Sequence, residues 1–142
     1  MLGEVYSKDK KLFVNYRVRN YHVDSYGHVN NATYLNFLED ARTDFFAYMD
    51  YPLSYLREKG VFIFITEIKI KYLKPAFLDD IITVSGYFSQ ILKVRAIWHQ
   101  EIFRGQEKLI DAYVTGAFIN TKGKPIKIPA YILSEMEKVY EI

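Results

Sequence analysis

Cysteine is absent from the 142-residue sequence, which excludes disulfides, thiolate catalysis and cysteine-based zinc sites. An excess of one charge is also missing, because 19 Lys and Arg residues balance 17 Asp and Glu residues to a formal net charge of +2. We therefore expect no nucleic-acid partner. The longest strongly apolar run, residues 61–65, is far too short to span a membrane, and the first residues lack the apolar core of a secretion signal. We expect a soluble, cytoplasmic protein that does not bind membranes.

Aromatic side chains are abundant: 13 Tyr and 10 Phe contribute to an aromatic content of 17%. They predict a core or groove that accepts large, flat groups. No repeat, low-complexity stretch or linker-like change of composition interrupts the chain. We therefore interpret residues 1–142 as one domain.

The pattern of apolar residues predicts an α+β fold. Period-two alternation and intervening turn-forming residues predict five strands, over residues 11–23, 61–73, 80–88, 91–104 and 107–121. Apolar residues at steps of three and four predict a helix of about four turns that begins after Asn30, with a buried stripe formed by Tyr34, Leu38, Ala41, Phe45 and Tyr48. A short helical turn is expected between Pro52 and Gly60, and a closing helix over residues 128–140. Short connections predict that successive strands of the later group pair antiparallel.

The segment 61–73 is apolar on both faces where it begins, with Phe62 and Phe64 on one face and Ile63 and Ile65 on the other. One helix covers only one face of a sheet. The sequence therefore predicts a covering partner for the second face, and a copy of the same chain is the simplest one.

The segment from Val23 to Asn31 carries an acid, an imidazole, a glycine and two amides between a strand and a helix. A helix N-terminus offers unpaired N–H donors, here expected at Asn31 and Ala32, which suit a carbonyl oxygen that becomes negative during acyl transfer. Asp24 would then attack the carbonyl carbon or remove a proton from water. The local pattern alone favours a purely structural interpretation, in which Asp24 caps a turn, Gly27 supplies a positive φ and Asn30 caps the helix.

The stretch from Tyr21 to Tyr34, together with Glu39-Asp40-Ala41-Arg42 and residues 71–75, resembles the 4-hydroxybenzoyl-CoA thioesterase family of hot-dog acyl-CoA thioesterases. This resemblance covers most of the chain. It implies a hot-dog fold, in which a five-stranded antiparallel sheet wraps one long helix. It also implies a homodimer, joined sheet edge to edge and often paired into a homotetramer, with active sites at the dimer interface.

By the same resemblance, Asp24 is the catalytic carboxylate, and the backbone N–H of Asn31 polarises the thioester carbonyl. The expected reaction is hydrolysis of a fatty acyl- or aryl-CoA to the free acid and coenzyme A, without a metal or other cofactor. The chain departs from many family members at His22, where they carry a second acid.

Two alternative functions stay open. A hot-dog hydratase or dehydratase would use His28 to remove a proton beside the thioester carbonyl, although Gly27-His28-Val29-Asn30 departs from the usual dehydratase loop. A non-catalytic module would bind acyl-CoA without releasing thiol. We interpret His28 as a packing or hydrogen-bonding residue of the loop, and His22 and His99 as structural.

Basic residues at the alternate, more polar positions of the predicted strands form a second group of candidate binding residues. Lys71, Lys93 and Arg95, together with Lys69, are candidates for contacts with the phosphates of coenzyme A. The alternative is a solvated strand face with protective charge. Three scattered histidines without cysteine do not have the spacing of a metal site.

Overall fold

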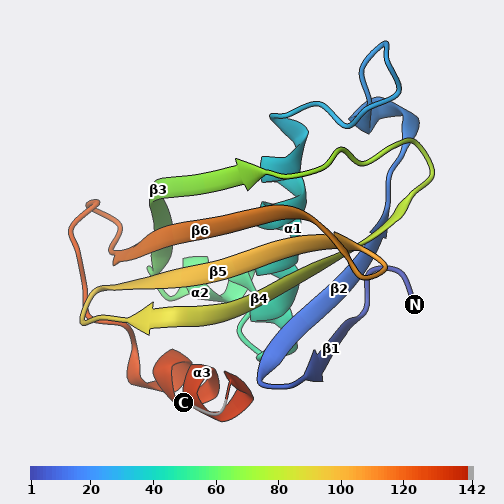
Figure 1. Cartoon of the computed structure of the whole chain (residues 1–142). Helices are drawn as coiled ribbons and strands as arrows, with labels where there is room; N and C mark the ends of the chain where they lie inside the picture. The colour runs from blue at the N-terminus through green and yellow to red at the C-terminus, as the bar shows by residue number, and fades with distance from the viewer. Residues whose placement is uncertain (141–142) are drawn as a thin grey trace.

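The computed structural model describes residues 1–140, and it confirms the α+β hot-dog architecture. The strands are β1 (Val5–Lys8), β2 (Lys11–Arg17), β3 (Phe62–Tyr72), β4 (Ile81–Ile91), β5 (Arg95–Arg104) and β6 (Glu107–Ile119). The helices are α1 (Thr33–Tyr48), α2 (Leu53–Glu58) and α3 (Ala130–Tyr140). All strands form one antiparallel sheet in the order β1-β2-β4-β5-β6-β3 (Figure 1).

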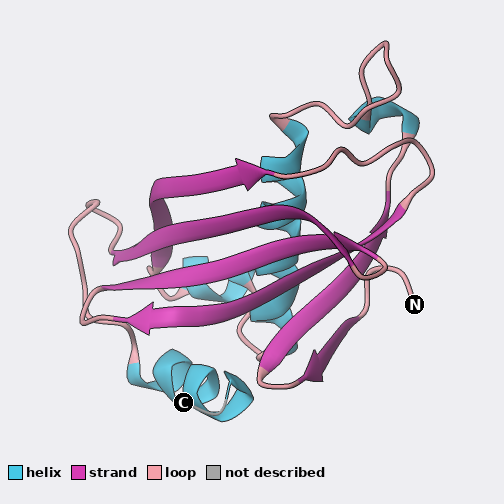
Figure 2. Cartoon of the chain, viewed as in Figure 1, coloured by secondary structure: helices cyan, strands magenta, loops and turns pink. Residues whose placement is uncertain are grey.

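Helix α1 crosses one face of the sheet, as Figures 1 and 2 show. Its sequence holds neither glycine nor proline, and Tyr34, Leu38, Ala41 and Phe45 form the buried stripe that their spacing predicts. Tyr48, the last residue of that predicted stripe, is instead 44% exposed at the C-terminal end of the helix. Helix α1 lies closest to β2 and β4. It also contacts β5, where Gln100 donates to Leu38 O.

Gly86 on β4 lets α1 lie close to the sheet. A Cβ atom at this position would lie 2.6 Å from Cε2 of Phe45, well inside van der Waals contact. The Phe45 ring, fully buried, therefore occupies the space that any larger residue at position 86 would need.

Two predicted strand boundaries were wrong. The first strand ends at Arg17 rather than at residue 23, because Asn20–His22 forms a 3-10 turn in which Arg19 N–H donates to His22 Nδ1. The turn between β4 and β5 lies at residues 92–94 rather than 89–90. Alternation alone does not reveal that a bulge between Phe88 and Gln90 extends β4 past the predicted turn.

The strand order also differs from the expected succession of neighbours. Strands β3 and β4 follow each other in the chain but do not pair: β3 pairs with β6, whereas β4 lies between β2 and β5. The connection 73–80 is long enough to cross to the other half of the sheet. The short strand β1, which sequence reasoning missed, adds a sixth strand at the far edge by pairing with β2.

The face of the sheet away from α1 is not covered by any helix within residues 1–140, as the front of Figure 1 shows. Helix α3 packs on the α1 side, where Tyr140 meets Phe88 edge to face at 4.9 Å between ring centroids. Phe64, on the uncovered face, is 59% exposed. Within the same residues, no helix has the length and apolar character that a bilayer crossing requires.

Candidate active site

A cavity of about 250 Å³ lies where the loop 23–31, the start of α1 and the end of β3 meet. Its size is just below the range typical of small-molecule sites. It brings together Asp24 and Asn31, the two residues for which the sequence predicts a joint role. The residues that line it are Asp24, His28, Val29, Asn31, Tyr34, Tyr72, Leu73, Lys74 and Pro75.

Asp24 is exposed and holds the loop in a tight turn. Its Oδ1 accepts hydrogen bonds from Tyr26 N–H at 2.9 Å and from His28 N–H at 3.3 Å. Gly27 takes a φ of +79°, a conformation that a residue with a Cβ atom adopts rarely. The turn-capping interpretation therefore holds for Oδ1. Within residues 1–140, no hydrogen bond occupies Oδ2, so the carboxylate keeps one oxygen for chemistry.

The backbone N–H of Asn31, just before α1, has no acceptor within residues 1–140. Asn30 N–H donates to His22 O, and Ala32 N–H donates to Asn30 Oδ1 at 2.9 Å. Asn31 N–H has no acceptor among the described residues, and Asn31 lines the cavity. We predicted free donors at both Asn31 and Ala32, and the Ala32 part was wrong because the Asn30 side chain satisfies that group. Asn30 caps the first turn, although the helix itself begins at Thr33.

Two tyrosines that sequence reasoning did not place in the site shape its wall. Tyr72 donates to Asn31 O at 3.1 Å and so fixes the orientation of that peptide. The Tyr34 hydroxyl accepts from Ala76 N–H at 2.9 Å and ties α1 to the segment after β3. Burial raises the pKa of Tyr34, which keeps its hydroxyl protonated. The only sequence signal for these roles was that both residues belong to the stretches that carry the family resemblance.

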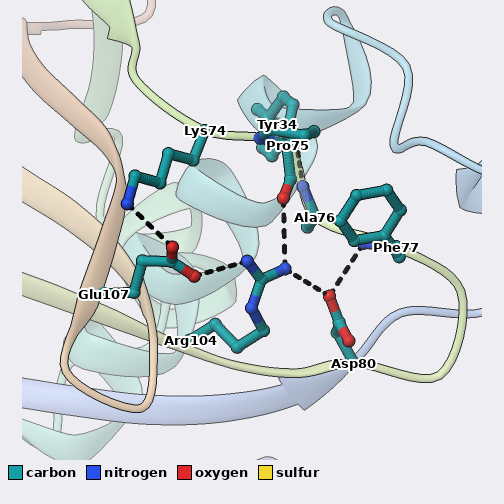
Figure 3. Close-up of polar contacts among 8 residues, drawn as sticks. All are labelled: Tyr34, Lys74, Pro75, Ala76, Phe77, Asp80, Arg104 and Glu107. Carbon is teal, nitrogen blue, oxygen red and sulfur yellow. Dashed lines mark hydrogen bonds and ion pairs between the residues drawn. The ribbon is translucent and has the colours of Figure 1, made fainter.

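Arg104 anchors the segment 73–80, which forms one side of the cavity (Figure 3). Its guanidinium donates to Pro75 O at 3.1 Å and to Asp80 Oδ2 at 2.8 Å, and it also pairs with Glu107. Asp80 Oδ2 in turn accepts from Phe77 N–H. One side chain from β5 thus links both ends of the segment, and this bridging contact was not evident from the sequence.

Replacing Arg104 by methionine is expected to loosen the segment 73–80. The bonds to Pro75 O and Asp80 disappear together, and the amides of Ala76 and Phe77 should exchange their hydrogens at least about tenfold faster. Lys74→Met is the matched control, because it removes only the exposed Lys74–Glu107 pair. Amide hydrogen exchange followed by NMR or mass spectrometry measures both variants, and equal protection in wild type and Arg104→Met would contradict the anchoring role.

The histidines near the site have structural contacts. The His28 ring packs edge to face on Phe77 at 4.9 Å, although His28 also lines the cavity. The His22 ring packs on Phe37 at 4.5 Å, and its Nδ1 accepts from Arg19 N–H at 2.8 Å. Burial, followed by the charge of Arg19, lowers the pKa of His22.

The lowered pKa of His22 predicts a stability that depends on pH. Neutral His22 is favoured in the folded state, so its contribution is complete above the unfolded pKa of about 6.5 and is lost as the pH falls. Thermal unfolding at pH 7 and pH 5 should show a larger loss of stability for wild type than for His22→Asn, whose Oδ1 replaces Nδ1 as acceptor without titrating. The same loss in both proteins would rule out this contribution.

The three basic residues proposed for phosphate contacts are not brought together within one chain. Lys71 pairs in register with Asp111, which pairs with Glu101, and Arg95 lies six residues before Glu101 along β5. That separation is about 20 Å. Lys93 lies in the turn before Arg95, and only Lys71 is near the Asp24 end of the sheet.

A polar cluster on the uncovered face was not predicted. His99, Glu101 and Asp111 place ligand atoms within 4.8 Å of one another. His99, however, bonds the Tyr87 hydroxyl at 2.7 Å and Asp111 at 2.6 Å, while Glu101 is buried and pairs with Lys108. These groups satisfy one another, and we assign no metal to them. The alternation of β5 places His99 and Glu101 on one face, but only the pairing with β6 adds Asp111.

Comparison with known proteins identifies the family. Residues 18–136 match the family described as the thioesterase-like superfamily. Long-chain acyl-CoA thioesterase FadM of Escherichia coli is 35% identical over 108 residues, 75% of this chain and 81% of that protein. Acyl-CoA thioesterase YbgC of Haemophilus influenzae is 30% identical over 108 residues, 75% of this chain and 79% of that protein.

Solved structures agree with this assignment. The crystal structure of a probable thioesterase from Bartonella henselae is similar with a TM-score of 0.79 and 29% identity, over 82% of this chain and 98% of that one. The matched family is broader than the 4-hydroxybenzoyl-CoA thioesterase group that the motif resembles. The chain belongs to the thioesterase-like superfamily and is a thioester hydrolase.

Proposed function

We propose that this protein hydrolyses fatty acyl-CoA thioesters, with Asp24 as the catalytic carboxylate and Asn31 N–H as the donor to the carbonyl oxygen. One observation carries the proposal: Asp24 and Asn31 line the same cavity, and within residues 1–140 neither Asp24 Oδ2 nor Asn31 N–H has a hydrogen-bond partner. The relatives FadM and YbgC are acyl-CoA thioesterases by name, and they support the substrate class.

The chemistry follows from the opposite character of these two groups. A thioester carbonyl oxygen that accepts a hydrogen bond from Asn31 N–H gains negative charge in the transition state, and the start of α1 stabilises that charge. Asp24 Oδ2 then attacks the carbonyl carbon, or it removes a proton from a water molecule that attacks instead. The carbon–sulfur bond breaks, and coenzyme A leaves as a thiolate, which needs no strong general acid. After direct attack by Asp24, water hydrolyses the mixed anhydride, releases the free acid and restores the carboxylate. No step uses a metal or redox cofactor.

The site is open to solvent along β3 in one chain. Strand β3 is 11 residues long and pairs only with β6 within residues 1–140, so its other edge presents unsatisfied backbone groups. A second copy that pairs along this edge would cover the cavity, whose lining includes Tyr72 and Leu73. We propose such a homodimer as the active unit, with the uncovered sheet face available for assembly to a homotetramer in the cytoplasm.

The phosphates of coenzyme A need a basic contact near the cavity mouth. Lys71 is the candidate at that end of the sheet, whereas Lys93 and Arg95 would reach the same coenzyme only from a partner chain, since about 20 Å separates them from Lys71. The proposal therefore assigns Lys71 to the protomer that supplies Asp24.

A panel of acyl-CoAs of increasing chain length, monitored by a thiol-reactive dye, tests the function directly. Release of free thiol with turnover is the expected result. Stoichiometric binding without thiol release would instead indicate an acyl-CoA binding module. Hydration of an unsaturated acyl-CoA that depends on His28 would indicate a hydratase.

A further inference from the structure

A second cavity, of about 150 Å³, lies between the middle of α1 and the start of β3. A cavity of this size holds a group of about benzene size, so it suits the end of a chain and not a whole substrate. The residues that line it are Glu39, Arg42, Thr43, Phe46, Leu53, Ile63, Ile65 and Trp98.

Arg42 is an unusual member of this mostly apolar lining. It is only 8% exposed, yet it forms no ion pair within residues 1–140. One guanidinium nitrogen donates to Gln100 Oε1 at 2.9 Å, and Gln100 donates to Leu38 O. The other guanidinium nitrogens have no hydrogen-bond partner among the described residues, and Arg42 lines the cavity. Burial lowers the pKa of Arg42 to about 10. A buried cation with unused donors is costly unless an acceptor reaches it.

A row of isoleucines on β3 lies between this cavity and the Asp24 cavity. Ile63 and Ile65 line the Arg42 cavity, and Tyr72 lines the Asp24 cavity at the other end of β3. Between them Ile68 and Ile70, half-buried, face the α1 side of the sheet, because they pair with the buried residues Val114 and Ala112 of β6. Ile68 and Ile70 pack against the core and keep part of their surface exposed, so an acyl chain that runs along β3 would contact them.

We infer that Arg42 binds an oxygen atom carried near the distal end of the acyl chain, so that the enzyme prefers ω-hydroxyacyl-CoA substrates of matching length. This inference rests on the proposed function. A neutral oxygen is favoured over a carboxylate because Glu39 lines the same cavity and would repel a negative group.

The length of the chain follows from helix geometry. Arg42 lies nine residues beyond Thr33, which is about 14 Å along the axis of α1. An extended chain advances about 1.2 Å per bond, so about ten to twelve carbon atoms span the interval from the carbonyl to Arg42. The Arg42 side chain leans toward the helix N-terminus, which favours the shorter end of that range.

The test compares matched pairs of acyl-CoA and ω-hydroxyacyl-CoA from about eight to about fourteen carbon atoms. The ratio of kcat/KM within each pair removes the intrinsic effect of chain length. For the wild type we expect this ratio to peak at ten to twelve carbons, about tenfold above the eight-carbon pair, as one charge-assisted hydrogen bond allows. A flat ratio across the series would overturn the inference, even where hydrolysis itself is fast.

Three variants test whether Arg42 causes the peak in the kcat/KM ratio. Arg42→Met should flatten the profile, Arg42→Lys should retain part of the peak, and Arg57→Met, at an exposed arginine on α2, should retain all of it. A peak that persists in a folded Arg42→Met protein would also overturn the inference. If Arg42→Met does not fold, the test rests on two results: a peak in the wild-type profile and its partial retention in Arg42→Lys support the inference, and a flat wild-type profile contradicts it.

Binding separates this inference from the proposed function. In Asp24→Asn, the dissociation constants of dodecanoyl-CoA and 12-hydroxydodecanoyl-CoA are measured by calorimetry. Tighter binding of the hydroxylated chain, lost when Arg42→Met is added, supports the role of Arg42 even if no acyl-CoA is hydrolysed. Equal binding of the two ligands contradicts it, whatever the catalytic result.

Discussion

Replacing Asp24 by asparagine is expected to lower the turnover of acyl-CoA hydrolysis by at least about a hundredfold while the protein folds normally. The two oxygens of Asp24 have different environments. Oδ1 holds the turn, which explains why folding should be normal, and Oδ2 is the proposed reactive atom, which explains why turnover should fall. Asparagine keeps an Oδ1 that accepts from Tyr26 and His28 N–H, so the turn survives. The group at the Oδ2 position becomes an uncharged amide, which neither attacks a thioester nor accepts a proton from water.

The measurement is steady-state hydrolysis with a thiol-reactive dye, together with circular dichroism and thermal unfolding of the same preparations. His28→Ala is the matched control in the same loop, because the His28 ring contacts Phe77 rather than a polar partner. Its activity should survive. An unchanged rate in Asp24→Asn, or loss of thioesterase activity only in His28→Ala, would move the catalytic role away from Asp24.

Gly86→Ala is expected to destabilise the fold by about 2 kcal/mol, although alanine is an ordinary residue in a strand. The added methyl group would lie 2.6 Å from Cε2 of Phe45, so that the ring, or α1 itself, has to move. The ring is fully buried, and a close-packed interior leaves little space for that movement. Urea unfolding of the variant and of wild type gives the difference in free energy.

A double-mutant cycle identifies the clash as the cause. Phe45→Leu alone destabilises the fold by removing buried ring atoms, but it also leaves room for a methyl group at position 86. Gly86→Ala should therefore cost at least about 1 kcal/mol less in the Phe45→Leu background than in wild type. If the two costs are equal, the contact between β4 and α1 does not explain the requirement for glycine.

The sequence predicted the features of this fold that depend on residues close together in the chain, and it did not predict those that depend on distant residues. Period-two and period-3.6 patterns found the five longer strands, α1 and α3, because each pattern reports which side of one element is buried. Helix α2 was predicted from the flanking Pro52 and Gly60. They did not reveal the bulge after Phe88, and the four-residue strand β1 is too short to show a pattern.

The candidate site divides in the same way. The loop around Asp24 and the start of α1 are neighbours in the chain, so their residue types and spacing were sufficient to propose a joint role. Tyr72 and Arg104 enter the site from β3 and β5, and their contacts with Asn31 O and Pro75 O join residues that lie far apart in the sequence. The residues around each position in the sequence do not indicate which distant residue it will contact. The opposite case is given by Lys71, Lys93 and Arg95. Their positions in the alternation pattern suggested a common site, but the fold does not bring them together.

The sequence by itself determined the three helices and the five longer strands, the helix-over-sheet arrangement and the loop in which an acid precedes a helix start, because these follow from periodicity and from the preferences of adjacent residues. Only the tertiary structure decided that β3 joins β6 at an edge and that Asn31 N–H meets no acceptor in the described part of the chain. Only the tertiary structure placed the donors of Arg42 in a cavity. Strand order and burial depend on contacts between distant residues, and those contacts are made only when the whole chain packs.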